Sequence, residues 1–190
     1  MQSHRYISAI LLLFLGGCFS EPEYSDVPEI GFKSIEQYTI LDAFDQPQGG
    51  VEITITFQDG DGNLGLDLNG EDADNEDFAD YIVSDTGDST LNKYRNNYFI
   101  DVYKKNEDEV FELVEYPDES SFSGVFPHLS ESEKEKPIEG DLEYSFILLP
   151  SSGTSPLSEG DVIKFEIQIA DRDLQDSNII ESDTITVIGY

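Results

Sequence analysis

The fold is decided by the stretch VEITITFQDGDGNLGL at residues 51–66. In its first half apolar and polar residues alternate with a period of two, which is typical of a strand that buries one face. The apolar positions are Val51, Ile53, Ile55 and Phe57. From Asp59 onward the stretch is rich in Asp, Asn and Gly, which favour turns. It therefore predicts a half-buried strand that runs directly into an acidic turn, with Ile55 facing the core and Thr54 facing outward.

The same alternation recurs along the chain, and helical periodicity is nearly absent. Besides 51–58, the expected strands are 30–40, 98–103, 110–114, 142–148, 163–169 and 180–188. About seven strands separated by turn residues predict an all-β fold, an antiparallel two-sheet sandwich with Phe165 in its core. A closed barrel is the alternative, because strand number alone does not separate the two. A long acidic insertion at 59–92 follows the second strand, and a short helix is expected inside it at Glu76–Val83.

The charge balance excludes two classes of partner. The chain has 190 residues, of which 41 are acidic and 10 basic, so its formal net charge is −31 at pH 7. A nucleic-acid backbone selects proteins that bring Lys and Arg to it, and anionic lipid attracts basic patches. Neither mode of binding is expected here. Apolar residues make up 38% of the chain, which is enough to bury the core of one domain.

The N-terminus carries a motif that predicts a location. An unbroken apolar run at 7–15 follows His4 and Arg5, is too short to span a bilayer, and ends in Leu15-Gly16-Gly17-Cys18. This closely resembles the lipobox of bacterial lipoproteins, in which the cysteine is acylated and becomes the first residue of the mature chain. The alternative is a general secretory signal with an incidental cysteine.

The lipobox resemblance divides the chain into three parts. They are a signal peptide at 1–17, the lipidated Cys18 with a flexible tether at 18–28, and a body at 29–190. Cys18 is the only cysteine, so its lipidation leaves no thiol for a disulfide or a thiolate metal site. The resemblance implies attachment to the outer membrane through the lipid, with the protein on either the periplasmic or the outer face.

Two stretches of the body resemble the immunoglobulin-like and cadherin-like domains of bacterial envelope proteins. They are residues 51–66 and VIKFEIQIADRDLQDSNIIESDTITV at 162–187. They are also similar to uncharacterised lipoproteins of Bacteroidota that carry FxDGDGxxG and, near the C-terminus, an ADRDxxxSN-type stretch. The resemblance implies an immunoglobulin-like topology. The Cys–Trp–Cys pattern of antibody domains is absent, so the likeness concerns architecture alone.

Few residues favour catalysis. The mature chain would contain one histidine, His128, in an expected loop, and no Ser–His–Asp, Cys–His or two-histidine metal arrangement can be assembled from it. We therefore expect no enzyme, but a binding or scaffolding module with an envelope protein or a glycan as partner. The alternative is a glycan-binding or glycan-processing accessory protein of an uptake system. Tyr81, Tyr94 and Tyr98 are candidate sugar platforms, although tyrosines with partly buried rings are the more common case.

Two Asp-rich turns form a candidate calcium site. The candidate ligands are Asp59, Asp61, Asn63, Asp67, Asp171, Asp173 and Asp176. Alternate oxygen donors suit a hard cation, although Leu64 and Gly70 depart from the EF-hand pattern. If the strands ending at Phe57 and Ala170 are the second and sixth of an immunoglobulin-like domain, their loops meet at one end. The alternative is two ordinary Asp-Gly turns in solvent.

Overall fold

The computed structural model describes residues 22–116, 121–130, 134–148 and 155–189, and in these the chain is all-β. The expected signal peptide and Cys18 lie outside the described residues. Helix is confined to two single 3₁₀ turns, η1 at Glu76–Phe78 and η2 at Lys93–Arg95. No helix in the described ranges has the length and apolar character needed to cross a membrane.

The first sheet contains three antiparallel strands in the order β1-β2-β7. They are β1 (Glu29–Leu41), β2 (Pro47–Asp59) and β7 (Ile138–Leu148). The central strand β2 pairs with β7 from Gly49 to Asp59 and with β1 up to Gln58, so residues 51–58 have a neighbouring strand on both sides. This position requires one face of β2 to be buried, as its alternation predicts.

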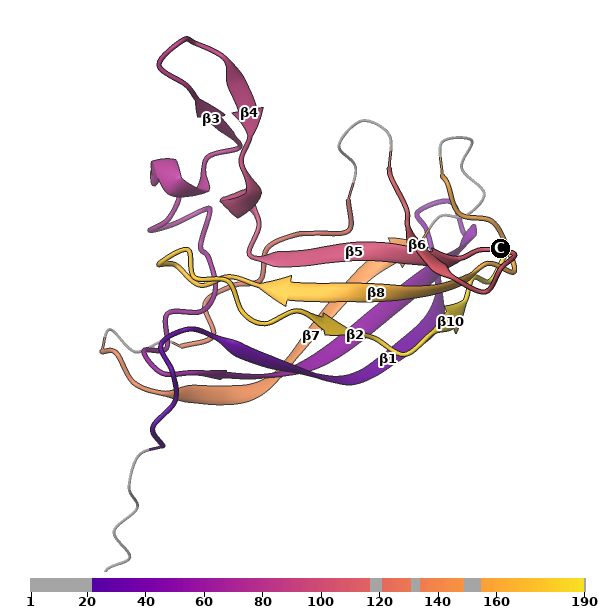
Figure 1. The fold of residues 1–190 in the computed structure, drawn as a ribbon, viewed down its shortest axis with the longest axis horizontal. Coiled ribbons are helices and arrows are strands. Elements are labelled where there is room, and N and C mark those ends of the chain that lie inside the picture. The colour runs from indigo at the N-terminus through magenta and orange to yellow at the C-terminus, as the bar shows by residue number, and fades with distance from the viewer. Residues whose placement is uncertain (1–21, 117–120, 131–133, 149–154, 190) are drawn as a thin grey trace, which may run out of the picture.

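The second sheet follows the order β10-β8-β5-β6, and β9 also pairs with β8. Its strands are β5 (Tyr98–Lys105), β6 (Phe111–Leu113), β8 (Val162–Ile169), β9 (Ile180–Glu181) and β10 (Ile185–Thr186). A separate two-stranded sheet, β3 (Tyr81–Val83) with β4 (Ser89–Leu91), forms a hairpin that projects away from the other strands (Figure 1).

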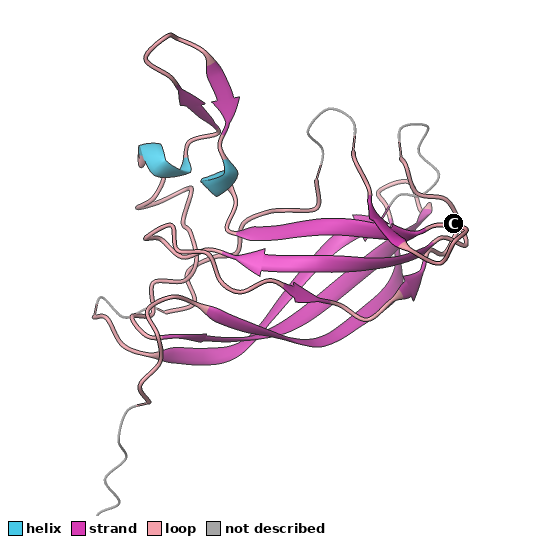
Figure 2. Cartoon of the chain, viewed as in Figure 1, coloured by secondary structure: helices cyan, strands magenta, loops and turns pink. Residues whose placement is uncertain are grey.

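Side chains from the two larger sheets meet in one apolar core. Ile55 and Phe165 are fully buried, which confirms their expected place on the inner faces. The Phe165 ring packs edge-on against Phe146 with 5.5 Å between ring centroids, joining β8 to β7. Tyr98 of β5 stacks on Tyr144 of β7 at 4.3 Å. An all-β chain with its core between antiparallel sheets is compatible with a sandwich (Figure 2).

Thr54 lies on the face of β2 opposite Ile53 and Ile55, yet only 8% of its surface is exposed. The register places Ser34 of β1 and Glu143 of β7 on either side of it. Side chains paired in this way stand about 4.5–5.5 Å apart and cover a small neighbour. Alternation therefore predicts which face a residue occupies, whereas its exposure also depends on having strands on both sides.

Each of the seven expected strand regions contains a strand, but the described part of the chain has ten strands. The region 180–188 is divided into β9 and β10, and the acidic insertion contributes β3 and β4. The helix expected at Glu76–Val83 is only the 3₁₀ turn η1, followed by β3. Asn75 caps η1 by accepting a hydrogen bond from the Asp77 amide, and the backbone is extended again at Ala79.

The chain enters the fold at the end where β2 finishes. The carbonyl of Ser25 accepts a hydrogen bond from the Gly60 amide at 2.8 Å, and the Tyr24 hydroxyl donates to Glu139 at 2.6 Å. Pro28 is buried. The last residues of the stretch expected to be a tether therefore contact the fold, because the turn after β2 offers them a free amide.

Candidate metal centre

The strand β2 delivers Asp59 to the candidate site. Because side chains alternate along a strand, position 59 shares the inner face with Phe57 and Ile55, and Asp59 is fully buried. The chain then turns at Gly62, whose φ of +74° favours glycine. A carboxylate is thus held at the end of an apolar core, where charge is costly.

The turn after β2 folds around Asn63. Its amide N–H donates to Asp59 Oδ2 at 3.1 Å and to Asp61 Oδ1 at 3.3 Å. Its side-chain nitrogen donates to Asp61 Oδ2 at 3.1 Å and to Asp173 Oδ2 at 3.2 Å. The side chain of Asn63 therefore bridges the turn after β2 and the loop after β8.

The loop after β8 supplies Asp171 and Asp173. Asp171 is 2% exposed and forms an isolated antiparallel bridge with Leu64, so the two loops lie against each other. Its carboxylate accepts hydrogen bonds from the Gln175 amide at 2.7 Å and from the Gln175 side chain at 3.3 Å. The structure brings together five of the candidate ligands. They are Asp59, Asp61, Asn63, Asp171 and Asp173.

The electrostatics of this cluster favour protonation. Burial, together with the charges of Asp61 and Asp171, raises the pKa of Asp59 to about 7, although hydrogen bonds from the Gly62 and Asn63 amides oppose the shift. Burial also raises the pKa of Asp171. The Oδ1 atoms of Asp59 and Asn63 are buried and have no hydrogen-bond partner. A buried oxygen without a hydrogen-bond partner destabilises the folded state until a proton or a cation reaches it.

Two candidate ligands have other partners. Asp67 is exposed and accepts a hydrogen bond from the Asn69 amide, and its own amide donates to Asp72. Asp176 forms an ion pair with Lys93 at 2.5 Å. The alternate spacing that suggested Asp67 holds along a strand, and β2 ends at Asp59.

As the side chains stand, the described residues contain no group of three or more His, Cys, Asp or Glu that could hold a metal ion. The side-chain nitrogen of Asn63 instead donates to the carboxylates of both Asp61 and Asp173. Rotating the side-chain amide of Asn63 by a half-turn would place its oxygen, which now has no hydrogen-bond partner, where its nitrogen lies. Oxygens of Asn63, Asp61 and Asp173 would then be neighbours, and oxygen is the ligand atom that a hard cation prefers.

A polar cavity of about 580 Å³ adjoins the cluster and is lined in part by Glu71, His128 and Arg172. His128 Nδ1 lies 3.1 Å from Glu71, and His128 Nε2 lies 2.9 Å from both Asp72 Oδ2 and Arg172 Nη1. These contacts join the insertion, the loop of His128 and the loop after β8. Sequence patterns missed them, because Asp72 and Arg172 lie 56 and 44 positions from His128.

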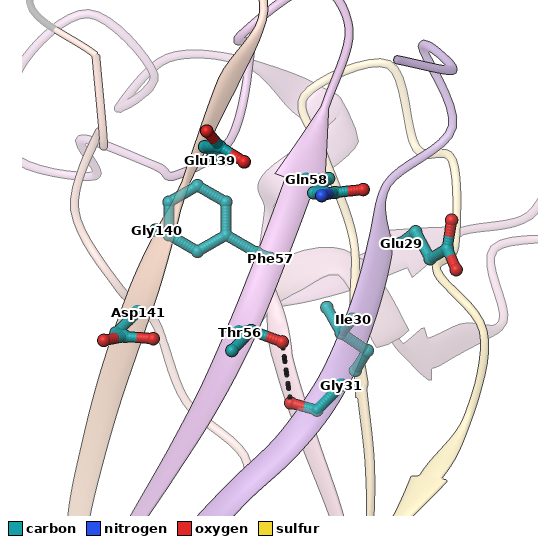
Figure 3. A pocket seen from close by; sticks show the side chains of 9 residues that line it. All are labelled: Glu29, Ile30, Gly31, Thr56, Phe57, Gln58, Glu139, Gly140 and Asp141. Atoms are coloured by element: carbon teal, nitrogen blue, oxygen red, sulfur yellow. Dashed lines mark hydrogen bonds between the residues drawn. The ribbon is translucent and has the colours of Figure 1, made fainter. Parts of the chain in front are cut away.

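A second cavity, of about 490 Å³, lies over the first sheet between Gly31 and Gly140 (Figure 3). Glu139 and Asp141 are the carboxylates on its β7 side, and Glu139 accepts the hydroxyl of Tyr24. Asp141 forms an ion pair with Lys33. Both carboxylates therefore have partners, so the unpartnered oxygens of the Asp59 cluster make it the stronger candidate site.

Of the three tyrosines proposed as a sugar platform, Tyr98 lies in the core, whereas Tyr81 and Tyr94 line one cavity at the surface. Tyr98 is fully buried and stacked on Tyr144, so it cannot present a face to a sugar. Tyr81 is 54% exposed, and Tyr94 packs edge-on against Phe99.

Comparisons with known proteins give no match: no family model, curated protein or solved structure is similar to this chain.

Proposed function

We propose that this protein is a non-catalytic binding or scaffolding module of the bacterial cell envelope, attached to the outer membrane through lipid on Cys18. In this proposal a calcium ion binds where β2 and β8 end. The observation that carries the calcium proposal is Asp59, a fully buried carboxylate with an unpartnered oxygen, close enough to Asp61 and Asp171 to be affected by their charges.

Calcium fits the chemistry of these donors. Asp59, Asp61, Asp173 and the side-chain oxygen of Asn63 offer only oxygen, and calcium binds six to eight oxygens from carboxylates, amides and water. A divalent cation would neutralise carboxylates that otherwise repel one another. It would also join the two loops that Asn63 now connects by hydrogen bonds.

We further propose an immunoglobulin-like topology. The order β1-β2-β7 corresponds to strands A, B and E of that fold, and β10-β8-β5-β6 corresponds to G, F, C and C′, with no counterpart of strand D among the described residues. In this assignment β2 and β8 are strands B and F, whose following loops share one end. That end is where protein modules of this architecture often carry binding loops.

The calcium proposal is tested by thermal unfolding in calcium and in chelator at equal ionic strength. Extracellular calcium modules have dissociation constants of about 0.1–1 mM. At roughly 10 mM calcium, linkage then stabilises the folded state by about 1.4–2.7 kcal/mol. We expect the melting temperature to rise by about 3–10 °C.

Two variants and one ion control complete the test. Asp59→Asn with Asp61→Asn should abolish the calcium-dependent shift. Glu107→Gln with Asp108→Asn removes the same number of charges from the turn between β5 and β6, at the other end of the strands, and should retain the shift. Thermal unfolding in magnesium at equal concentration measures how much any divalent cation stabilises the protein by screening its negative charges. A rise that is equal in magnesium, or that persists without Asp59 and Asp61, rejects the site.

A further inference from the structure

The hairpin β3–β4 exposes apolar side chains that the core does not use. Tyr81, Ile82 and Val83 are 54%, 53% and 67% exposed, so both faces of β3 are open. Figure 1 shows the hairpin projecting from the end of the molecule where β8 finishes. Three consecutive exposed apolar residues do not stabilise the fold, and such patches commonly mark a site of interaction.

A groove lies at the base of the hairpin. It is a cavity of about 560 Å³, lined by apolar side chains of β3 together with Tyr94 and Leu174. Its structure is set by Asn92, whose side-chain nitrogen donates to the carbonyls of Asp77 and Ala79 at 2.7 and 2.9 Å. The groove is therefore held in shape without a ligand.

Leu174 reaches the groove through an unfavourable backbone conformation. Its φ is +61°, in the left-handed region that bulky residues rarely adopt. The turn is closed by a hydrogen bond from the Leu174 amide to the Asp171 carbonyl at 3.3 Å. Such strain is found most often at functional sites, and here it places an apolar side chain beside the exposed hairpin.

Two acidic side chains belong to the lining of this apolar groove. Glu76 and Asp77 line it directly. Residues 59–92, which include the hairpin, contain 11 acidic residues and no Lys, Arg or His. Lys93 and Arg95 follow this segment directly, and Lys93 is already paired with Asp176. An apolar centre with an acidic rim selects a partner that has an apolar centre and a basic rim.

We propose that the groove between the β3–β4 hairpin and Leu174 docks a segment of another protein in which an apolar side chain is flanked by Lys or Arg. A second copy of this chain, with its net charge of −31, would bring like charges to the same place. Charge complementarity therefore favours a basic protein partner. This inference does not depend on the calcium site.

The test uses the purified full chain as bait for a library of random 12-residue peptides displayed on phage, in calcium and in chelator. Selected peptides should carry Lys or Arg beside apolar residues, and their affinity should fall as salt rises. Enrichment that depends on the groove in either buffer supports the proposal, whatever the melting experiments show.

Ile82→Ser with Val83→Ser should weaken binding of the selected peptides at least about tenfold, because exposed apolar anchors supply most of the affinity of such surfaces. Leu41→Ser with Phe44→Ser changes two apolar residues that are 63% and 81% exposed, near the β1–β2 turn at the other end of the strands, and should leave binding unchanged. Glu76→Gln with Asp77→Asn should weaken the salt dependence, whereas Glu107→Gln with Asp108→Asn should not.

Three results would overturn the proposal. The first is a selection that yields no peptides, or peptides without basic residues. The second is affinity that survives the serine substitutions in β3. The third is a dimer in sedimentation that the β3 substitutions abolish, because the groove would then receive a second copy of this chain.

Discussion

Asp59 is the residue at which the fold and the proposed function are most closely linked. Alternation continues two residues beyond Phe57, the last apolar residue of β2, so the same pattern that buries Phe57 also buries the carboxylate of Asp59. An isolated buried charge is disfavoured, and the pKa of Asp59 is accordingly raised to about 7. The contribution of Asp59 to stability must therefore depend on pH.

The metal-free protein should lose stability as pH rises. The ordinary pKa of Asp is 3.8 and that of folded Asp59 is about 7, so between these values the folded state binds more protons than the unfolded state. The Asp59 carboxyl contributes its full share of the unfolding free energy below about pH 4, and this contribution is lost as pH rises toward 7. Between pH 5 and pH 8 the loss should be roughly 2–3 kcal/mol, measured by urea unfolding in chelator.

The remaining carboxylates also repel one another more strongly as they ionise, so Asp59→Asn provides the reference. The difference in pH slope between the two proteins isolates Asp59. Saturating calcium should reduce this difference, because the cation favours the ionised carboxylate. Equal slopes in chelator would mean that Asp59 is ionised at neutral pH in the folded protein.

At the residue scale, sequence reasoning located most of the cluster but not its surroundings. Asp59, Asp61 and Asn63 follow a strongly alternating strand, so their place at its end could be predicted. The contacts of His128 with Asp72 and Arg172 could not, because they join three loops whose relative positions depend on tertiary packing. Asp67, which the spacing also suggested, is exposed and accepts a hydrogen bond from the Asn69 amide, since spacing in a turn does not fix direction.

At the element scale, long strands were more predictable than short ones. β2 and β8 bury one face along their whole length, so their sequences alternate clearly. β3 and β4 have three residues each and almost no buried side chain, so no alternation marks them. The sequence signal that favours this hairpin is the turn between its strands, where Gly87 has a φ of +86° and is flanked by β-prone residues.

The two faces of a strand should differ sharply in their sensitivity to substitution. Phe165→Ala removes a fully buried ring that packs against Phe146 and should cost about 3–5 kcal/mol of unfolding free energy. Thr54→Ala removes a small side chain that lies between Ser34 and Glu143 and should cost less than about 1 kcal/mol. Urea unfolding measures both changes, and similar losses from the two would contradict the assignment of faces.

At the scale of the whole molecule, the acidic end is also the end at which the chain enters the fold. Ser25 is hydrogen-bonded to Gly60, one residue after Asp59. From Cys18 to Tyr24 an extended chain spans at most about 20–22 Å. A lipid on Cys18 would therefore hold the Asp59 cluster close to the membrane, and an end with so many carboxylates would be repelled by anionic headgroups unless cations intervene.

Lipidation of Cys18 is the prediction that determines the cellular location of the protein. Mass spectrometry of the mature protein should show an N-terminal Cys18 that carries acyl chains, and the protein should fractionate with membranes. Cys18→Ala should leave an uncleaved, unlipidated precursor outside the outer-membrane fraction. Because β1 begins only at Glu29, the body of this variant should unfold at the same temperature as the body of the wild type.

Measuring both the location and the melting temperature of Cys18→Ala separates loss of the anchor from loss of the fold. A variant that misfolds would change both location and melting temperature, whereas an anchor variant changes location alone. More than one acyl chain is needed for stable attachment, so a partial modification should leave a measurable soluble fraction. A free thiol at Cys18 in the wild-type mature protein, or membrane attachment that persists in Cys18→Ala, would show that this residue is not the anchor. The carboxylate cluster and the hairpin groove would then have to be placed in the envelope by some other contact.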